Sequence, residues 1–318
     1  MQRVMVTGAA GYIGGQTMLA LRDAGHWVMA VDRRPVPGHL RSVADRRVQA
    51  DFASQAALDQ IESQGIAAVI HCAGTSLVGP SVTDPADYYQ NNFVRTKALA
   101  DYILEHNLTV KLIYSSSAAV YGEPIMTPCQ EIDPPAPISP YGKSKLMVEW
   151  LLSSYQQAYG LGSVSFRYFN ACGADPAGRH GQEPGATHII ARVLESARDN
   201  LAFGLYGTDY DTADGTCVRD YVHVADIAQA HVQALSSDSP LGVFNLGTAQ
   251  GHSNREVIAT AERVVGRSIW VTAQDRMPGD PAVLTAAADP WTRATGWRPQ
   301  YSLEEIIHSA WKWYRRGV

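Results

Sequence analysis

Cysteine is scarce in this sequence, and metal-ligand spacings are missing. Only four cysteines occur in 318 residues (Cys72, Cys129, Cys172 and Cys217), and no two of them form a Cys-x-x-Cys pair. The ten histidines show no metal-ligand spacing either. We therefore expect reduced, buried thiols rather than a disulfide framework, and no metal centre.

An excess of basic charge and long apolar runs are also absent. Lysine and arginine number 26 against 31 aspartates and glutamates, a net charge of −5, so a nucleic-acid partner is not expected. No apolar run is long enough to span a membrane, and the N-terminus enters a strand without a signal pattern. These features predict a cytoplasmic globular protein whose length fits one large domain or two interleaved ones.

A glycine-rich turn follows the first apolar run. Residues 3–7 read as a strand, residues up to Ala24 as a helix, and residues 27–31 as a second strand ending at Asp32. The turn between strand and helix contains Gly8, Gly11 and Gly14. Glycines let the backbone approach a pyrophosphate, and the helix start offers free N–H groups and a positive dipole end. This order of elements predicts a dinucleotide site.

The acid after the second strand indicates which dinucleotide binds. Asp32 is placed to accept hydrogen bonds from a ribose hydroxyl and would repel a 2′-phosphate, so NAD is favoured over NADP. Arg33 and Arg34 follow directly. They either weaken that preference or are solvated loop charges, and we favour the second interpretation.

Strand and helix continue to alternate through the first half. Further strands are expected at residues 47–50, 67–71 and 110–114, with a long helix from Pro85 to about Asn107. The strands end in polar or small residues, among them Asp51, Gly74 and the serine triplet 115–117. The fold class is therefore α/β: a doubly wound parallel (Rossmann-type) sheet that binds ligands at the carboxyl ends of its strands, with a smaller C-terminal substrate-binding lobe.

One helix carries a tyrosine and a lysine on the same face. Ser139 and Pro140 form a helix start, and Tyr141 and Lys145 follow it four residues apart. A neighbouring ammonium favours the phenolate, so we expect Lys145 to lower the pKa of Tyr141 and make it a proton acceptor near neutral pH. Taken alone, an ordinary surface Tyr–Lys pair is the simpler interpretation.

Together these motifs resemble the extended short-chain dehydrogenases/reductases, and more closely the UDP-glucose (UDP-galactose) 4-epimerase family. The resemblance covers essentially the whole chain. It is carried by the glycine turn, Asp32, the serine triplet, the Tyr141/Lys145 pair and the stretches 114–122, 139–149, 167–170, 214–224 and 244–248.

The resemblance implies an NAD-dependent isomerase that transiently oxidises C4 of a UDP-hexose to a 4-keto sugar. By position, Tyr141 would take the hydroxyl proton, Lys145 would contact the nicotinamide ribose, and Ser117 would hydrogen-bond the C4 oxygen. NAD would stay bound between turnovers because each cycle regenerates it. Relatives are commonly homodimers joined by helices that correspond here to 85–107 and 140–158.

The resemblance also implies two sets of binding residues. The cofactor set is Gly8, Gly11, Tyr12, Ile13, Gly14, Asp32, Asp51, Phe52, Ala73, Gly74, Asn91, Ser115, Tyr141, Lys145 and Tyr168. The substrate set is Ser117, Tyr141, Asn170, His188, Ile189, Tyr206, Arg219 and Asp280. Considered singly, Tyr206 also fits a core aromatic and Arg219 a structural salt bridge. A guanidinium nevertheless suits a diphosphate, because it forms paired, charge-assisted hydrogen bonds.

Several positions depart from the family pattern. Ala118 and Ala119 stand where dehydratases and decarboxylases carry acids, which favours an epimerase. Met277 stands where relatives commonly have a second diphosphate-binding arginine, so either Arg276 substitutes for it or the affinity is lower. Ser76 stands where many relatives have a lysine that faces the cofactor phosphates. Leu284 is intermediate in size at the wall near the sugar C2. The alternatives are therefore epimerases of N-acetylhexosamine, uronate or pentose sugars, a nucleotide-sugar reductase, or a non-catalytic NAD-binding protein.

The second half is expected to build the substrate lobe. Residues 174–185 and 205–220 are turn-rich, and helices are expected over 188–198 and 224–235, with a strand at 242–245. Capping boxes at Ser253 and Ser302 open two more helices. The expected division is 1–170 with parts of 222–265 for NAD, and 171–221 with 266–318 for the UDP-sugar.

Overall fold

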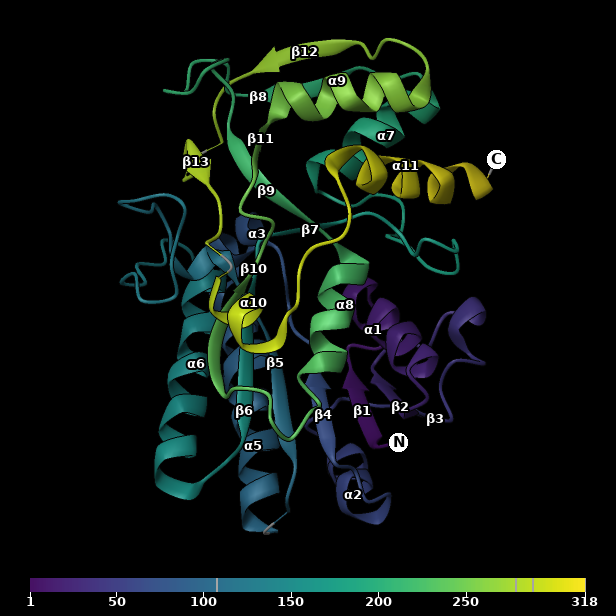
Figure 1. Ribbon diagram of the computed structural model, residues 1–318, viewed down its shortest axis with the longest axis vertical. Helices are drawn as coiled ribbons and strands as arrows, with labels where there is room; N and C mark the ends of the chain where they lie inside the picture. Colours follow the sequence, from purple (N-terminus) through teal and green to yellow (C-terminus); the bar gives the residue numbers. More distant parts are fainter. Residues whose placement is uncertain (107, 278, 288, 318) are drawn as a thin grey trace.

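A seven-stranded parallel sheet forms the larger part of the molecule (Figure 1). The computed structural model describes residues 1–106, 108–277, 279–287 and 289–317. The strand order is β10-β6-β5-β4-β1-β2-β3, and every neighbouring pair is parallel. The strands are β1 (Arg3–Thr7), β2 (Trp27–Asp32), β3 (Arg46–Gln49), β4 (Ala68–His71), β5 (Lys111–Ser117), β6 (Ser163–Tyr168) and β10 (Gly242–Leu246). The doubly wound fold expected from the sequence is confirmed.

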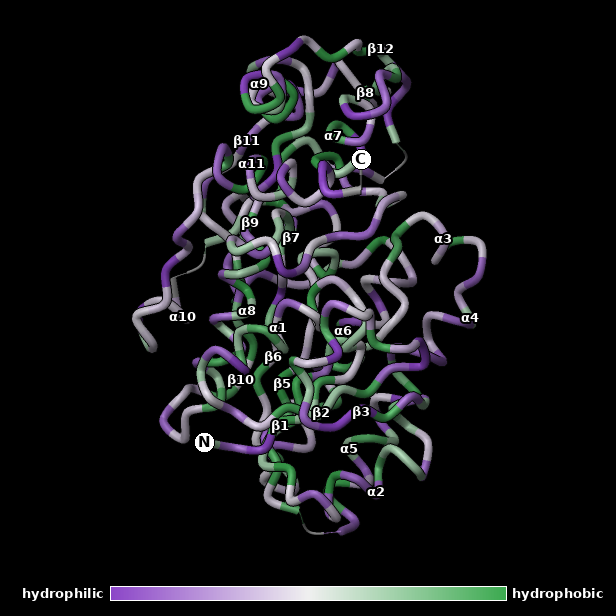
Figure 2. The backbone as a smooth tube through the Cα atoms, turned by 90° about the vertical axis from the view of Figure 1, so that its right-hand side faces the viewer, coloured by the Kyte–Doolittle hydropathy of each residue, from purple (hydrophilic) through white to green (hydrophobic). Residues whose placement is uncertain are grey.

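Helices cover both faces of this sheet. One face is covered by α1 (Tyr12–Asp23) and α8 (Val224–Gln233), and the other by α2 (Gln55–Ser63), α5 (Arg95–Glu105) and α6 (Pro140–Tyr159). Alternate strand residues serve the two faces: Val4 and Val6 lie in one core, and Met5 lies in the other. This explains the apolar runs 4–6, 28–31 and 68–70 in β1, β2 and β4, and green segments gather around the large sheet in Figure 2.

A smaller lobe lies beyond the carboxyl ends of the strands (Figure 1). Its own core packs α7 (Ile189–Asp199), α9 (Asn254–Val265) and α11 (Leu303–Tyr314) against one another. Its strands are β8 (Phe203–Tyr206) paired with β12 (Val271–Gln274), and β9 (Val218–His223) paired with β7 (Asn170–Cys172), β11 (Gly251–Ser253) and β13 (Val283–Leu284). The chain then returns to the large sheet through α10 (Asp289–Thr295), where Trp291 packs on Phe166.

The helix expected over 85–107 is divided into three segments. It comprises α4 (Pro85–Tyr88), a π-helical segment η2 (Tyr89–Val94) and α5, and residue 107 lies outside the described residues. Hydrogen bonds explain the wider turn: the Asn92 amide binds both the N–H and the C=O of Thr75, and also Ser144. Segments with π geometry frequently occur at functional sites.

Other local expectations were met to different degrees. Helix α6 begins as expected, because Ser139 accepts a hydrogen bond from the Gly142 N–H at 3.1 Å, and both capping boxes are formed. The stretch 205–220 is not only turns, since its two ends belong to β8 and β9. The sequence also did not indicate α3 (Val78–Thr83) or the short 3-10 helices η1 (Gly38–Leu40), η3 (Ala118–Val120) and η4 (Arg315–Gly317).

The structure bears on disulfide bonds, metal-ligand clusters and membrane-spanning helices. All four cysteines are free, and only Cys72 is partly exposed. Within the described ranges, no cluster of three or more histidine, cysteine or carboxylate side chains is arranged to hold a metal ion. In the same part of the chain, no helix has the length and apolar character needed to cross a bilayer.

Candidate active site

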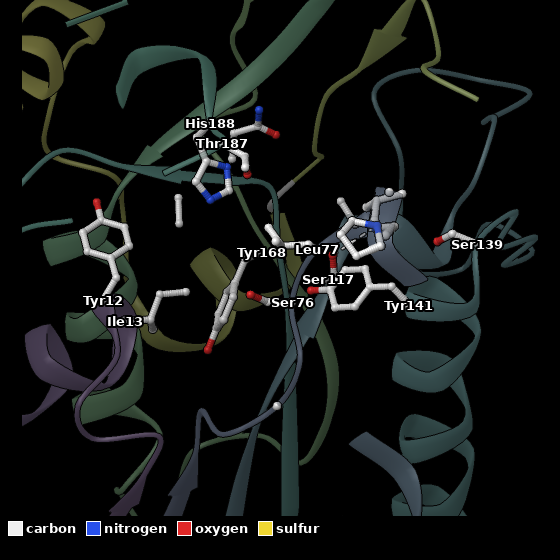
Figure 3. A pocket seen from close by; sticks show the side chains of 18 of the residues that line it. Tyr12, Ile13, Ser76, Leu77, Ser117, Ser139, Tyr141, Tyr168, Thr187 and His188 are labelled. Atoms are coloured by element: carbon white, nitrogen blue, oxygen red, sulfur yellow. Dashed lines mark hydrogen bonds between the residues drawn. The ribbon is translucent and has the colours of Figure 1, made fainter. Parts of the chain in front are cut away.

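A cleft of about 1320 Å³ separates the carboxyl edge of the large sheet from the small lobe (Figure 3). Because this volume exceeds that of most sites for a single small molecule, the cleft has room for two ligands. The sequence-predicted residues that line it are Gly8, Gly11, Tyr12, Ile13, Gly14, Asp32, Phe52, Ala73, Gly74, Asn91, Ser117, Tyr141, Tyr168, Asn170, His188, Ile189, Tyr206, Arg219 and Asp280. Of the predicted set, the buried Ser115 and Lys145 and the partly exposed Asp51 are not part of the lining.

The glycine turn leaves no room for side chains. Gly8 has φ of +68°, and a Cβ there would lie 2.6 Å from the Ala73 nitrogen. A Cβ on Gly14 would lie 2.2 Å from the Gly8 carbonyl oxygen. Gly11 caps α1 without a side-chain hydrogen bond, so the first N–H groups of that helix stay available at the cleft. The turn is therefore a cradle for an anionic group such as a pyrophosphate.

Asp32 stands at the end of β2, where its carboxylate is oriented by the backbone. One oxygen accepts from the Ala10 N–H at 3.0 Å and the other from the Arg34 N–H at 2.8 Å. Asp51, the next acid along this edge, pairs with Arg95 at 3.1 Å, and Asp32 lies 3.8 Å from the Nε of the exposed Arg34. The cleft thus presents one oriented carboxylate, Asp32, for a ribose hydroxyl.

Three predicted catalytic side chains meet at the junction of β5 and α6. Ser117 and Tyr141 lie side by side on the cleft wall (Figure 3). Lys145 is buried behind them, with its Nζ 5.8 Å from the centre of the Tyr141 ring, and it donates to the Ser115 carbonyl at 2.8 Å. The tyrosine and serine are therefore exposed to a substrate, and the ammonium supports them from the protein side.

The expected lowering of the tyrosine pKa is not found in this structure. Burial raises the pKa of Tyr141, although a hydrogen bond with Ser117 opposes the rise. Burial also lowers the pKa of Lys145 to about 8. The prediction was wrong here because it considered the neighbouring charge but not desolvation, which penalises the charged form of both groups.

The turn after β4 is held by the π-helical segment. The Asn91 amide donates to Asp87 at 2.7 Å and to the Thr75 hydroxyl at 3.0 Å. The adjacent Gly74 lies so close to Asn92 that a Cβ would come within 2.8 Å of the amide oxygen. This arrangement fixes Ala73 and Gly74 at the cleft floor next to the buried Lys145.

Sequence reasoning missed two buried networks behind this wall. In the first, Ser115 binds the Tyr168 hydroxyl at 2.9 Å, and that hydroxyl binds His231 at 2.5 Å. In the second, Glu149 accepts from Ser116 at 2.5 Å and pairs with Arg167 at 2.7 Å. A usable signal existed for Glu149, because it continues the four-residue spacing of Tyr141 and Lys145 along one helix face.

The small-lobe wall gathers the predicted substrate residues, but their charges are largely paired. Arg219 pairs with Asp280 at 2.5 Å. Arg276 pairs with Asp209 at 2.7 Å and lines a separate concavity, so its expected role as substitute for the position of Met277 is not supported. Met277, Leu284 and Ser76 do line the cleft. Arg192 and Thr187 also line it, and neither had been predicted.

Comparisons with known proteins agree with this geometry. A family model described as "NAD dependent epimerase/dehydratase family" matches residues 4–247. The UDP-glucose 4-epimerase of Azospirillum brasilense is 44% identical over 98% of this chain and 92% of its own length. The UDP-glucose 4-epimerase of Halalkalibacterium halodurans is 42% identical, over 98% and 95%. A crystal structure of UDP-glucose-4-epimerase from Stenotrophomonas maltophila with bound NAD and formylated UDP-arabinopyranose superimposes with a TM-score of 0.94 at 33% identity, covering 100% of this chain and 99% of that one.

Proposed function

This chain belongs to the NAD dependent epimerase/dehydratase family, and we propose that it is an NAD-dependent 4-epimerase that interconverts UDP-glucose and UDP-galactose. The observation that carries the proposal is the placement of Ser117 and Tyr141, backed by Lys145, on a cleft wall next to a glycine cradle. A proton acceptor beside a dinucleotide site suits oxidation of a sugar hydroxyl.

The residues present fit NAD. The cradle at Gly8, Gly11 and Gly14 would hold the pyrophosphate, and Asp32 would hold the adenosine ribose. Lys145 is buried behind the cleft wall, and it would contact the nicotinamide ribose from that side. When bound, NAD⁺ supplies a hydride acceptor for C4 and a cationic ring that favours the Tyr141 phenolate.

The protein's own contribution is to hold and move one proton. Tyr141 would accept the C4 hydroxyl proton, while Ser117 would hydrogen-bond the same oxygen and the phenol. Lys145 is held by the Ser115 carbonyl, so its charge stays at a fixed position behind the tyrosine ring. After the 4-keto sugar has turned over, the same phenol would return the proton on the other face.

Two alanines beside the serine support epimerisation rather than dehydration. Ala118 and Ala119 line the cleft directly after Ser117 and carry no group able to assist elimination of water. The short apolar side chains also leave space in which a keto sugar could rotate. Tyr206, Arg219 and Asp280 would hold the uridine diphosphate during that rotation, together with Asn170, His188 and Ile189.

The sugar specificity is the open part of the proposal. Leu284 lines the cleft and is partly buried, so it limits bulk near the sugar less than a tyrosine would. Epimerases of N-acetylhexosamine, uronate or pentose sugars therefore remain the second candidate, and a reductase or a non-catalytic NAD-binding protein the third.

One experiment separates these candidates. The purified protein is incubated without added NAD with UDP-galactose, UDP-N-acetylgalactosamine, UDP-glucuronate or UDP-xylose, and the products are separated. We expect conversion of UDP-galactose to UDP-glucose at constant total sugar. Conversion of only another sugar would change the substrate but keep the mechanism. No conversion even with added NAD or NADH would overturn the epimerase assignment.

We propose in addition that the protein is a homodimer joined through α5 and α6. Trp150 and Tyr159 on α6 and Val94 before α5 are exposed apolar side chains, at 60%, 66% and 46% exposure. Burial of such side chains would stabilise a pair of helices from each subunit. Light scattering after size exclusion should give twice the mass of one chain for the wild type. The variant Trp150→Glu should give the mass of a single chain.

We further propose a cytoplasmic location and a division into two lobes. Free cysteines are typical of reducing compartments, and cell fractionation tests the location. The lobes would be 1–170 with parts of 222–265, and 171–221 with 266–318, although α9 packs on the small lobe and α10 on the large one. Limited proteolysis should cut first in the connections between these segments.

A further inference from the structure

The diphosphate of a UDP-sugar carries two negative charges, so its binding calls for positively charged side chains on the cleft walls. Among the described residues, the arginines that line the cleft are Arg33, Arg34, Arg192 and Arg219, and no lysine lines it. Arg33 and Arg34 follow β2 at the glycine-turn end. Two arginines are therefore left on the small-lobe wall for a diphosphate.

Arg219 is already committed to protein acceptors. One terminal nitrogen donates to the Val218 carbonyl at 2.7 Å. The other donates to Asp280 and to the Pro281 carbonyl, both at 2.5 Å. Its charge is thus matched by a carboxylate, and a diphosphate would have to share these donors with backbone oxygens.

Three other residues near this wall do not supply a free positive charge for the diphosphate. Arg276 pairs with Asp209 and lines the separate concavity rather than the cleft. Burial lowers the pKa of His188, so its imidazole is neutral at pH 7. Met277, which lines the cleft, carries no charge.

Arg192 differs from all of these. It lies in the first part of α7, and its guanidinium carbon is 5.2 Å from the centre of the Tyr206 ring and 5.4 Å from that of Phe203. In the part of the chain that the structure describes, its side chain forms no ion pair with a carboxylate. A guanidinium stacked on an aromatic face keeps its in-plane N–H groups directed outward, where they can bind phosphate oxygens in pairs.

We propose that Arg192 binds the diphosphate of the UDP-sugar, and that its stacking on Tyr206 and Phe203 holds it in place for this contact. Arg192 is then the main source of uncompensated positive charge on the small-lobe wall. This inference rests on the proposed function, because it names a residue that recognises the same substrate class.

The test is calorimetric binding of UDP, UMP and uridine to the full-length protein with its NAD, comparing wild type with Arg192→Met. Methionine removes the charge and keeps an apolar stem beside Tyr206. We expect the affinity for UDP to fall about ten- to hundredfold, that for UMP to fall less, and that for uridine to change about twofold or less. Equal losses for all three ligands would overturn the proposal, because Arg192 would then act only by supporting the Tyr206 ring.

Salt dependence and kinetics give independent readouts. The UDP affinity of the wild type should weaken more steeply with added KCl than that of Arg192→Met, and equal slopes would contradict a charge contact. The variant should also raise KM for the UDP-sugar while kcat stays close to wild type, as expected when uniform binding is lost. A lower kcat with unchanged KM would contradict the inference.

A matched control is Arg276→Met, which removes an arginine of the same lobe that does not line the cleft. It should change UDP affinity by about twofold or less. Failure of the wild type to bind UDP would overturn both the proposed function and this inference. Binding by the wild type with an unchanged Arg192→Met affinity would overturn this inference alone.

Discussion

The two walls of the cleft hold their polar groups in different ways. On the large-sheet wall, Glu149 and Arg167 form an ion pair with side chains only 3% and 5% exposed, directly behind the strand that carries Ser117. On the small-lobe wall, Arg219 and Asp280 pair at the cleft surface, where the carboxylate side chain is 36% exposed. The first pair ties together the elements that carry the proposed catalytic residues, while in the second the guanidinium is 9% exposed and the carboxylate is open to the cleft.

This difference separates chemistry from recognition. Tyr141 and Lys145 lie on one long helix, and Glu149 ties that helix to β5 and β6 through Ser116 and Arg167. The small-lobe wall is assembled from the start of α7, short strands and loops, and it places Arg192, Arg219 and Asp280 at the cleft. Substitutions on the first wall should therefore affect rate and stability, and those on the second should affect affinity.

The largest expected effect is on the chemistry of the first wall. Tyr141→Phe should lower turnover about 10³- to 10⁴-fold, because it removes the proton acceptor. It should leave NAD bound, since the cradle at Gly8 and Gly14 is untouched. Turnover is measured by product separation, and NAD by its release on denaturation. Turnover within about tenfold of wild type would remove Tyr141 from the mechanism.

The two ion pairs give a direct comparison of stability. Glu149→Gln leaves Arg167 buried without its carboxylate and should lower the free energy of unfolding by about 3–5 kcal/mol. Asp280→Asn removes a carboxylate that is 36% exposed, and Arg219 keeps its backbone carbonyl partners, so it should cost less, about 1–2 kcal/mol. Urea unfolding of both variants checks this. Equal losses would show that the two walls do not differ in the way described.

A smaller effect is expected at the serine beside the phenol. Ser117→Ala removes a hydrogen bond that favours the Tyr141 phenolate, and should lower kcat about ten- to hundredfold. The adjacent Ser116 binds Glu149 instead, so Ser116→Ala should lower kcat much less. Steady-state kinetics of the two variants measure this difference. A larger loss of kcat in Ser116→Ala than in Ser117→Ala would show that Ser117 is not the serine that assists proton transfer.

The last expected effect concerns acid stability, to which both walls contribute. Burial lowers the pKa of His71 and His231 to about 3, and that of His180 and His223 to about 4. Below about pH 6.5 the unfolded chain binds protons that the folded chain excludes, so stability falls as pH falls toward 4. Each of the four histidines should contribute about 1.4 kcal/mol per pH unit there, and Asp226, whose pKa burial raises to about 6, acts in the opposite direction. Urea unfolding at pH 7, 6 and 5 measures the slope, and a flat profile would contradict these shifts.

The sequence was most informative about the large-sheet wall. Its glycine turn, the acid after β2 and the Tyr141/Lys145 spacing are local patterns, each set by a few neighbouring residues, and the structure brings them to one sheet edge. The start of α6 was also predictable, because Ser139 caps the helix through a contact three residues away.

What was missed depends on contacts between distant segments. The π-helical turn is stabilised by Asn92 binding Thr75 and Ser144, which are far from it in sequence. The pKa of Tyr141 depends on burial, and spacing along a helix does not report burial. Arg192 was missed because its stacking partner, Tyr206, lies on another element, and no local motif marks such a pair.

The central claim is that this cleft oxidises C4 of a UDP-hexose and returns the same hydrogen to the other face. The most direct test uses UDP-galactose carrying deuterium at C4, with the purified protein in ordinary water. The account predicts UDP-glucose that retains deuterium at C4, because a hydride that passes to a bound nicotinamide and back would not exchange with water. UDP-glucose that has lost the label to solvent would contradict it.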